Sequence, residues 1–205
     1  FPEEPIEQLR LATMAVFKSW NGKRAFDYRK AAGIPHDLGT AVNIVAMVFG
    51  NLGQDSGTGV ATTRDVTTGA NEMEGDFLIN AQGEDVVSGR HPVTDTDRLP
   101  VALPEVAQRL EELRHALEAT FGDAQEFEFT VQDGRLYLLQ TRTAKRTPWA
   151  ALRMAVEQVR EGLATPAQAL ARLDGIDLAA IERRRVADEG EVALATAQPA
   201  SIGLA

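Results

Sequence analysis

The sequence predicts an α+β fold, and three observations carry this prediction. Apolar residues recur at helical spacing in two stretches, residues 5–31 and Pro104–Thr120. Short runs rich in β-branched and aromatic residues lie between and after these stretches, separated by glycine-rich turns. After Thr147 the composition shifts to Ala, Arg, Glu and Leu, which indicates a small all-helical segment behind an α+β unit.

The first half of the chain is expected to hold one interrupted helix and three strands. Asn21-Gly22 interrupts the helical pattern of residues 5–31. The three strands are predicted, in order, over Thr40–Phe49, Val60–Arg64 and Glu74–Ala81. The first of these should be buried, because its apolar and β-branched residues are nearly continuous.

The second half begins with the clearest helix, Pro104–Thr120, whose first turn suits proline. Two short runs joined by Gln132-Asp133-Gly134 then predict a hairpin. Three short helices should follow, over Pro148–Leu163, Pro166–Leu173 and Leu178–Arg185. The expected organisation is an α+β unit over residues 1–147, a helical linker over 148–192 and a connecting tail over 193–205.

The amino-acid composition of the chain excludes several classes of function. The net charge of −9 argues against a dedicated nucleic-acid binder, because such proteins usually carry a basic stripe. The chain has no cysteine, which removes disulfides, thiolate catalysis and Cys-based zinc sites, and which fits a cytoplasmic protein. No apolar run approaches the roughly 20 residues that cross a bilayer, so no membrane partner is expected. The opening Phe-Pro-Glu-Glu-Pro, without an initiator Met, suggests a fragment of a longer chain.

The hairpin carries the strongest chemical signal. Polar and apolar residues alternate from Glu126 to Val131, so Glu126, Glu128 and Thr130 share one strand face. A two-residue Asp133-Gly134 turn would place Leu139 and Thr141 beside Glu128.

A three-residue loop with Gly134 as a bulge pairs Val131 with Arg135 instead. This register places Glu126 and Glu128 on the face of Leu138, Gln140 and Arg142, and it gathers the aromatic residues and Leu139 on the other face. We expect it, because it separates polar from apolar side chains: Phe127, Phe129, Tyr137 and Leu139 would all lie on the apolar face.

The polar face so predicted joins two carboxylates, an amide oxygen and a guanidinium. One or two protein oxygens, completed by phosphates and water, suit Mg²⁺, and Arg142 at the end of the face could neutralise phosphate charge. The residues alone leave a second interpretation open, in which this is a solvated face of an edge hairpin with a surface ion pair.

Several sequence blocks in order resemble the ATP-grasp nucleotide-binding domain of the pyruvate, phosphate dikinase family. The blocks are Gly39-Thr-Ala-Val-Asn43, Met47-Val-Phe-Gly-Asn51, Asp55-Ser-Gly-Thr-Gly-Val-Ala61, Leu78-Ile-Asn-Ala-Gln-Gly-Glu-Asp-Val-Val87, Glu128-Phe-Thr-Val131, Leu139-Gln-Thr-Arg142 and Lys145-Arg-Thr147. The resemblance implies the later part of this domain over residues 1–147, with a mostly antiparallel sheet and flanking helices. It weakens in the helical linker and ends at Pro199–Ala205, which is similar to the entry to the family's phosphohistidine domain.

The family converts ATP, phosphate and pyruvate to AMP, pyrophosphate and phosphoenolpyruvate through a swivelling phosphohistidine. By resemblance, Glu128 and Gln140 bind the catalytic Mg²⁺, Arg142 contacts the ATP phosphates, and Glu128 and Arg142 are catalytic. Glu126 and Gln140 are also implied to bind ATP, and Glu126 stands where the family usually has Asp. The remaining residues implied by resemblance are Thr58, Asp85 and Met47 for ATP binding and Glu84 for docking of the phosphohistidine domain.

Each of these residues also has a structural interpretation. Thr58 lies in what could be an ordinary glycine-rich turn, and Glu84 and Asp85 could form a solvated acidic loop. Val45 replaces a Gln common in the family, which removes a polar contact if that strand lines adenine. Arg64 is expected to pair with Asp65 or Glu74 rather than to reach phosphates.

The preferred function is therefore part of a pyruvate, phosphate dikinase, whose partners would be ATP and the phosphohistidine domain of the same parent chain, a homodimer by resemblance. A phosphoenolpyruvate synthase or another dikinase is the alternative within this class. A non-catalytic binding or regulatory domain is the alternative outside it. Neither His36, His91 nor His115 has the surroundings of a phosphocarrier, so the chain alone is expected to show no turnover.

Overall fold

The computed structural model describes residues 2–87, 94–95, 99–177 and 181, and these form two compact units that divide between Met47 and Val48. The first unit contains helices α1 (Pro5–Trp20) and α2 (Lys23–Ala31), as the helical spacing predicted. Asn21 and Gly22 separate them. The carboxylate of Glu4 accepts from the Ile6 amide at the start of α1.

A cation–π contact joins α2 to the end of α1. The guanidinium of Arg29 lies 3.8 Å from the Trp20 ring centroid and donates to the Trp20 carbonyl oxygen and to Nδ1 of His36. The His36 ring stacks on Phe26 with the ring centroids 4.2 Å apart. These contacts fix the turn that follows α2.

The predicted buried strand over Thr40–Phe49 is wrong for this structure. The backbone there forms no strand, and the side chains of Ile44 and Val45 are 66% and 81% exposed. A strand needs a neighbour for its backbone hydrogen bonds, and none of the described strands pairs with this segment. High β propensity alone therefore does not place this segment in the sheet.

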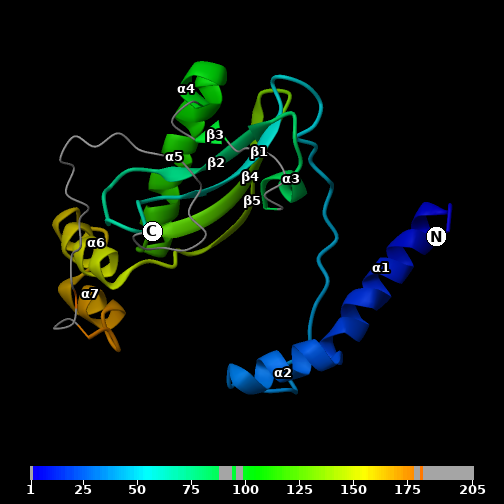
Figure 1. Ribbon diagram of the computed structural model, residues 1–205, viewed down its shortest axis with the longest axis horizontal. Coiled ribbons are helices and arrows are strands. Elements are labelled where there is room, and N and C mark those ends of the chain that lie inside the picture. Colours follow the sequence, from blue (N-terminus) through cyan, green and yellow to red (C-terminus); the bar gives the residue numbers. More distant parts are fainter. Residues whose placement is uncertain (1, 88–93, 96–98, 178–180, 182–205) are drawn as a thin grey trace, which may run out of the picture. The chain divides into compact units, whose positions relative to one another are not determined.

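The second unit is built on an antiparallel sheet with the strand order β3-β2-β1-β4-β5 (Figure 1). The strands are β1 (Gly57–Thr62), β2 (Glu74–Ile79), β3 (Thr94–Asp95), β4 (Gln125–Gln132) and β5 (Arg135–Thr143). This confirms the α+β class. Two of the three strands predicted before the long helix correspond to β1 and β2, although β1 begins three residues and ends two residues earlier than predicted and β2 ends two residues earlier. The helices of this unit are α3 (Gly83–Val87), α4 (Leu99–Ala102), α5 (Pro104–Phe121), α6 (Pro148–Arg160) and α7 (Pro166–Arg172).

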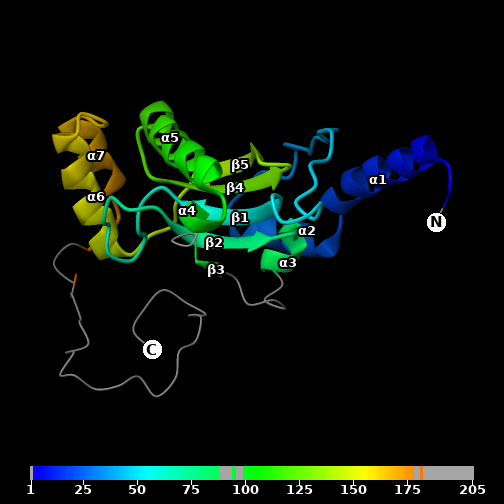
Figure 2. The same ribbon diagram turned by 90° about the horizontal axis from the view of Figure 1, so that it is seen from above.

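The core lies between the sheet and α5, which runs across one face of it (Figure 2). Val106, Leu110 and Leu117 of α5 pack with Phe127 and Phe129 of β4. The apolar stripe of the helix and the alternate residues of the strand thus form one cluster, as their spacing predicted. The other sheet face carries the polar residues of the hairpin.

Glycine in β1 makes room for this core. A Cβ on Gly59 would lie 2.5 Å from Cζ of Phe129, and one on Gly57 would lie 2.5 Å from Cζ of Phe77. The rings of Phe77 and Phe129 stack across β1 with centroids 5.8 Å apart. Two glycines in the central strand therefore allow two large rings to pass over it.

Helices α6 and α7 follow the sheet closely, as predicted, although each ends before its expected last residue. Thr147 caps α6, and Thr165 caps α7 with a full capping box to Gln168. Met154 of α6 packs with Ala124 and Ala144 beside the hairpin. The predicted helix Leu178–Arg185 and the tail over 193–205 lie outside the described residues, and the domain boundaries at 147 and 192 stay predictions.

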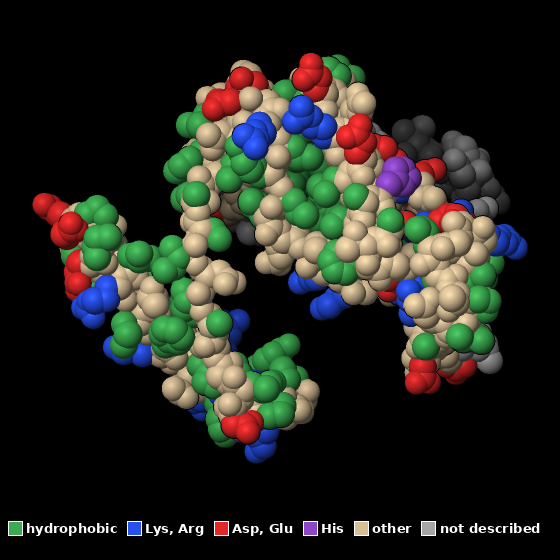
Figure 3. Space-filling view, turned by 180° about the vertical axis from the view of Figure 1, so that it is seen from behind, with side chains coloured by type: hydrophobic (Ala, Val, Ile, Leu, Met, Phe, Trp, Pro, Cys, Tyr) green, Lys and Arg blue, Asp and Glu red, His purple; other side chains and the backbone are tan. Residues whose placement is uncertain are grey.

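Side chains at the surface of the second unit include large apolar ones. Figure 3 shows hydrophobic side chains in the middle of one view of this unit, with charged side chains around them. Leu139 of β5 is 53% exposed and Phe121 of α5 is 52% exposed.

Within the described residues, no helix is both long and apolar enough to cross a bilayer.

Candidate nucleotide and metal site on the sheet

The turn of the hairpin differs from the prediction. Gln132 pairs directly with Arg135, so the loop has two residues, Asp133 and Gly134. Both have positive φ, 50° and 72°, which is the geometry of a type I′ turn. The expected three-residue loop, which would have paired Val131 with Arg135, is wrong because Asp133 tolerates the left-handed conformation beside glycine.

A β-bulge nevertheless restores the predicted polar face. The register shifts between Glu128 and Phe129, so that Phe129 pairs with Leu138 while Glu128 pairs with Gln140. Leu139 is the extra residue on β5. Beyond the bulge, Glu126, Glu128, Gln140 and Arg142 share one sheet face, as expected.

Near the turn, the predicted faces are wrong for three residues of β5. Leu138 lies opposite Phe129 rather than on the glutamate face, and Tyr137 lies opposite Thr130 rather than among the phenylalanines. Leu139 does not join the core, since it sits at the bulge and is exposed. The bulge reverses the alternation of side chains along β5. No single register could therefore have predicted the correct sheet face for residues at both ends of the strand.

Two cross-strand pairs define the candidate site. Glu126 and Arg142 lie opposite each other, and Nη2 of Arg142 donates to Oε1 of Glu126 over 2.5 Å. Two residues further along β4, Glu128 lies opposite Gln140, and both side chains are exposed. The hydrogen bond and charge of Glu126, with a smaller effect from Glu128, raise the pKa of Arg142. Arg142 is therefore a permanent cation beside two carboxylates.

The polar face extends across the sheet from these pairs. Val60 of β1 lies between Glu128 and Asp76 of β2, and Thr62 lies between Glu126 and Glu74. The face is closed at its turn end, where Thr58 and Thr130 are 3% and 2% exposed. It is open at the end that carries Glu128.

The side chains on this face could bind a divalent cation only if further ligands complete the coordination shell of the metal. Glu128 and Gln140 offer a carboxylate and an amide oxygen on facing strands. Among the described residues, no group of three His, Cys, Asp or Glu side chains converges as a closed metal site. Mg²⁺ commonly takes one or two protein oxygens and completes its shell with phosphates and water. The donor set therefore suits a metal that arrives with a phosphate ligand.

Thr58 lies on the same sheet face, but its hydroxyl is occupied inside the sheet. It donates to the carbonyl oxygen of Phe129 over 3.1 Å, and it lies 3.3 Å from the hydroxyl of Thr130. The predicted residues Met47, Glu84 and Asp85 are not brought onto this face by any described contact. Met47 is 69% exposed at the end of the first unit.

Glu84 and Asp85 form part of the short helix α3 rather than the expected loop. The carboxylate of Asp85 accepts from the backbone amide of Gln82 over 2.8 Å, which holds the start of the helix. Glu84 is exposed. These two acidic residues therefore have different environments although they are adjacent.

Arg64 has partners that the sequence did not indicate. It pairs with Glu118 of α5 at 2.7 Å and with Glu161 just beyond α6, instead of with Asp65 or Glu74. The Arg64 side chain is fully buried. The expectation that Arg64 has a structural role is consistent with this geometry, but its partners lie too far away in sequence for a local pattern to reveal them.

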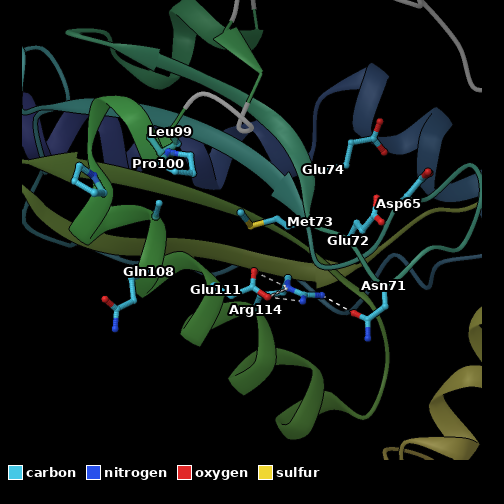
Figure 4. Close-up of a pocket in the computed structure, with 12 residues that line it drawn as sticks. Asp65, Asn71, Glu72, Met73, Glu74, Leu99, Pro100, Gln108, Glu111 and Arg114 are labelled. Carbon is cyan, nitrogen blue, oxygen red and sulfur yellow. Dashed lines mark hydrogen bonds and ion pairs between the residues drawn. The ribbon is translucent and has the colours of Figure 1, made fainter.

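A pocket lies away from the hairpin face, between the N-terminal half of α5 and the residues that precede β2 (Figure 4). Its volume is about 840 Å³. Arg114 lies at one side of it and is already bonded to Glu111 and Asn71. None of the predicted site residues lines this pocket, whereas Glu126, Glu128, Gln140 and Arg142 lie together on the hairpin face.

Sequence comparison connects this geometry with a family of known chemistry. The model of the pyruvate phosphate dikinase AMP/ATP-binding domain matches residues 4–105. A pyruvate, phosphate dikinase of Rickettsia conorii is 47% identical over 98% of this chain, and one of Clostridium symbiosum is 47% identical over 87% of it. Pyruvate, phosphate dikinase 1, chloroplastic, of Zea mays is 47% identical over 83%. The chain covers only 24%, 20% and 18% of these relatives, respectively.

Proposed function

This chain belongs to the pyruvate, phosphate dikinase family, and on that premise we propose that its polar sheet face is one wall of the ATP site of a longer phosphotransfer enzyme. The observation that carries the proposal is the pairing of Glu128 with Gln140 beside the Glu126–Arg142 ion pair. Four polar groups of complementary kind thus face the same side of β4 and β5. Such groups suit a ligand composed of a metal ion and a triphosphate.

Each residue of the face has a separate role in this proposal. Glu128 and Gln140 hold Mg²⁺, which would neutralise charge on the phosphates and orient them. Arg142 contacts the phosphates and acts on the charge that develops during transfer. Glu126 positions Arg142, because its carboxylate accepts a hydrogen bond from the guanidinium. The longer side chain of Glu, compared with the Asp usual in the family, leaves that bond intact.

The remaining predicted residues belong to the surroundings of the nucleotide. We place Met47 and Asp85 near the ATP cleft and exposed Glu84 at the surface on which the phosphohistidine domain docks. For Thr58 we propose a part in the wall without a phosphate contact from its hydroxyl, which already donates to Phe129.

The proposed parent reaction is the one that the family resemblance implies. In the longer enzyme, ATP, phosphate and pyruvate would yield AMP, pyrophosphate and phosphoenolpyruvate through a phosphohistidine. His36 accepts from Arg29 and His115 lies 3.2 Å from Glu111, so neither of these two described histidines is placed as a mobile carrier. The carrier would be on another domain of the same parent chain. A homodimeric parent and a cytoplasmic location complete the proposal.

Nucleotide binding to this chain tests the site directly. Mn²⁺ can replace Mg²⁺ as a probe, and in the presence of ATP it should broaden the NMR signals of residues near Glu128 and Gln140 selectively. Glu128→Gln should abolish the ATP-dependent broadening. Glu112→Gln, on the exposed side of α5, is the matched control and should behave like the wild type. Equal broadening in Glu128→Gln and wild type would rule out this metal site.

A turnover assay separates the site from the complete reaction. We expect this chain alone to form no phosphoenolpyruvate from ATP, phosphate and pyruvate, because the proposed carrier is not on it. Measurable product would contradict that expectation. ATP binding without product is the expected result, and absence of ATP binding would contradict the proposed site.

A further inference from the structure

The strand that carries Gln140 and Arg142 is paired on one side only. β5 is the last strand in the sheet order, so among the described strands β4 is its sole partner. Leu139 is unpaired at the bulge, which separates the pairs near the turn from those of residues 140–143. An edge strand interrupted by a bulge has few backbone hydrogen bonds to hold it. The position of Arg142 therefore depends on further contacts of this short segment.

Thr141 supplies such a contact from the opposite face of the sheet. It pairs with Phe127, whose side chain lies in the core, so its own side chain faces away from the polar face. The hydroxyl of Thr141 lies 3.2 Å from Oε1 of Gln125 and 3.3 Å from the carbonyl oxygen of Glu126. Both acceptors belong to β4. Since Arg142 pairs with Glu126 on the polar face, β5 is attached to β4 from both faces at this point.

The carboxamide of Gln125 is fixed in one orientation. Gln125 is 2% exposed, and its Nε2 donates to the carbonyl oxygens of Asp123 and Ala124, each over 3.2 Å. This leaves Oε1 as the acceptor directed at Thr141. The backbone amide of Gln125 donates to the hydroxyl of Thr63 over 3.0 Å, which ties the residue to the chain beyond β1. The acceptor for Thr141 is therefore in place before any ligand binds.

We infer that Thr141 is a positioning residue of the nucleotide site, whose hydroxyl, bonded beneath the polar face, holds Arg142 where it meets the phosphates. This inference rests on the proposed function and adds to it a residue that does not touch the ligand. Without the hydroxyl, residues 140–143 keep their backbone pairing with β4 but are free to shift at the bulge. The loss should therefore appear as weaker binding of the ligand that Arg142 contacts.

Three substitutions on β5 test this role. Thr141→Val removes the hydroxyl and keeps the shape of the side chain, whereas Thr141→Ser keeps the hydroxyl. Thr143→Val is the matched control, because Thr143 is an exposed threonine two residues further along the same strand. Calorimetry should show that Thr141→Val weakens Mg·ATP binding by the whole chain about three- to tenfold, as for the loss of one hydrogen bond. Thr141→Ser and Thr143→Val should bind Mg·ATP like the wild type.

Two further measurements separate positioning from general stability. In an Arg142→Ala background, Thr141→Val should weaken Mg·ATP binding less than about twofold, because the residue that it positions is gone. In hydrogen exchange without ligand, the backbone amides of residues 140–143 should exchange faster in Thr141→Val than in the wild type. The amides of β1 should keep their protection, because the rest of the sheet stays packed.

Several results would overturn the inference while the nucleotide site stands. These are wild-type ATP affinity in Thr141→Val, a loss in Thr141→Ser as large as in Thr141→Val, and an equal loss in the Arg142→Ala background. Unchanged exchange at residues 140–143 would contradict it too, as would faster exchange throughout β1, since the hydroxyl would then support the whole sheet. Wild-type protein that binds no Mg·ATP would overturn the proposed function as well.

Discussion

The guanidinium of Arg64 donates to both carboxylate oxygens of Glu118, and the two side chains are 0% and 3% exposed. Arg64 follows β1 and Glu118 lies near the end of α5, so this pair joins the central strand to the helix that covers the core. Arg64 also pairs with Glu161 beyond α6. One buried guanidinium therefore connects the sheet, the long helix and the helical segment.

Arg64→Met should destabilise the second unit strongly. It leaves the buried carboxylate of Glu118 without its partner, which typically costs about 3–5 kcal/mol in the free energy of unfolding. Urea unfolding measures the change. Arg109→Met, at an exposed position of α5, is the control and should have little effect. Adding Glu118→Leu to Arg64→Met should recover part of the loss; a double variant less stable than Arg64→Met would contradict the charge argument.

The stability of the second unit should fall in acid because of two carboxyl groups. The hydrogen bond from Arg64 lowers the pKa of Glu161 below its usual 4.5, although burial opposes this. At Asp123 burial favours the neutral form, but the hydrogen bond and charge of Arg146 outweigh it and lower the pKa below 3.8. Each group therefore stabilises the fold fully above its unfolded pKa and loses this effect as the pH falls through its folded pKa.

The free energy of unfolding, measured from pH 7 to pH 3, should thus decrease below the usual carboxyl pKa values. Asp123→Asn should lower stability at neutral pH and make the decrease in acid shallower. Glu112→Gln, which changes an exposed carboxylate, should leave the pH dependence as it is. A steeper acid loss in Asp123→Asn would show that this carboxylate is not stabilised by its arginine.

Gly59→Ala should destabilise the sheet, because the new Cβ would lie 2.5 Å from Cζ of Phe129 and 2.7 Å from the carbonyl oxygen of Asp76. Overpacking of this kind costs about 1–3 kcal/mol, which thermal or urea unfolding resolves. Gly83→Ala is the matched change, since a Cβ there meets nothing within 4 Å. It should leave stability unchanged or raise it slightly. A neutral Gly59→Ala would mean that Phe129 can move aside.

Arg142→Ala should weaken ATP binding about tenfold or more, because a hydrogen bond to a charged phosphate contributes about 1.5–3 kcal/mol. Binding of AMP should change much less if Arg142 contacts the phosphates beyond the first. Arg135→Ala is the control on the same strand, at the turn end beside Tyr137. Equal losses for ATP and AMP in Arg142→Ala would place this side chain elsewhere on the nucleotide.

Some features of the hairpin follow from its local sequence, and others depend on a bulge that the sequence does not reveal. Strict alternation in β4 predicted which side chains share a face, because successive residues of any strand point to opposite sides. The turn type and the faces of Tyr137 and Leu138 were predicted wrongly. Their positions depend on a bulge at Leu139, which leaves no local signature in the sequence. Glu126, Glu128, Gln140 and Arg142 still meet, because the two-residue turn and the bulge together restore the expected parity.

The sequence by itself determined the α+β class, the longer helices α1, α2, α5, α6 and α7 to within a few residues, and the polar face of the hairpin, since periodicity is a local property of the chain. It did not predict the short helices α3 and α4. Tertiary structure decided which strands pair, so Thr40–Phe49 stayed outside the sheet despite its β propensity. It also decided the partners of Arg64 and the hydrogen bond from the Phe49 amide to the Gln132 side chain, because those contacts join residues 54 and 83 positions apart. Contacts at such distances depend on the packed fold, which no local pattern encodes.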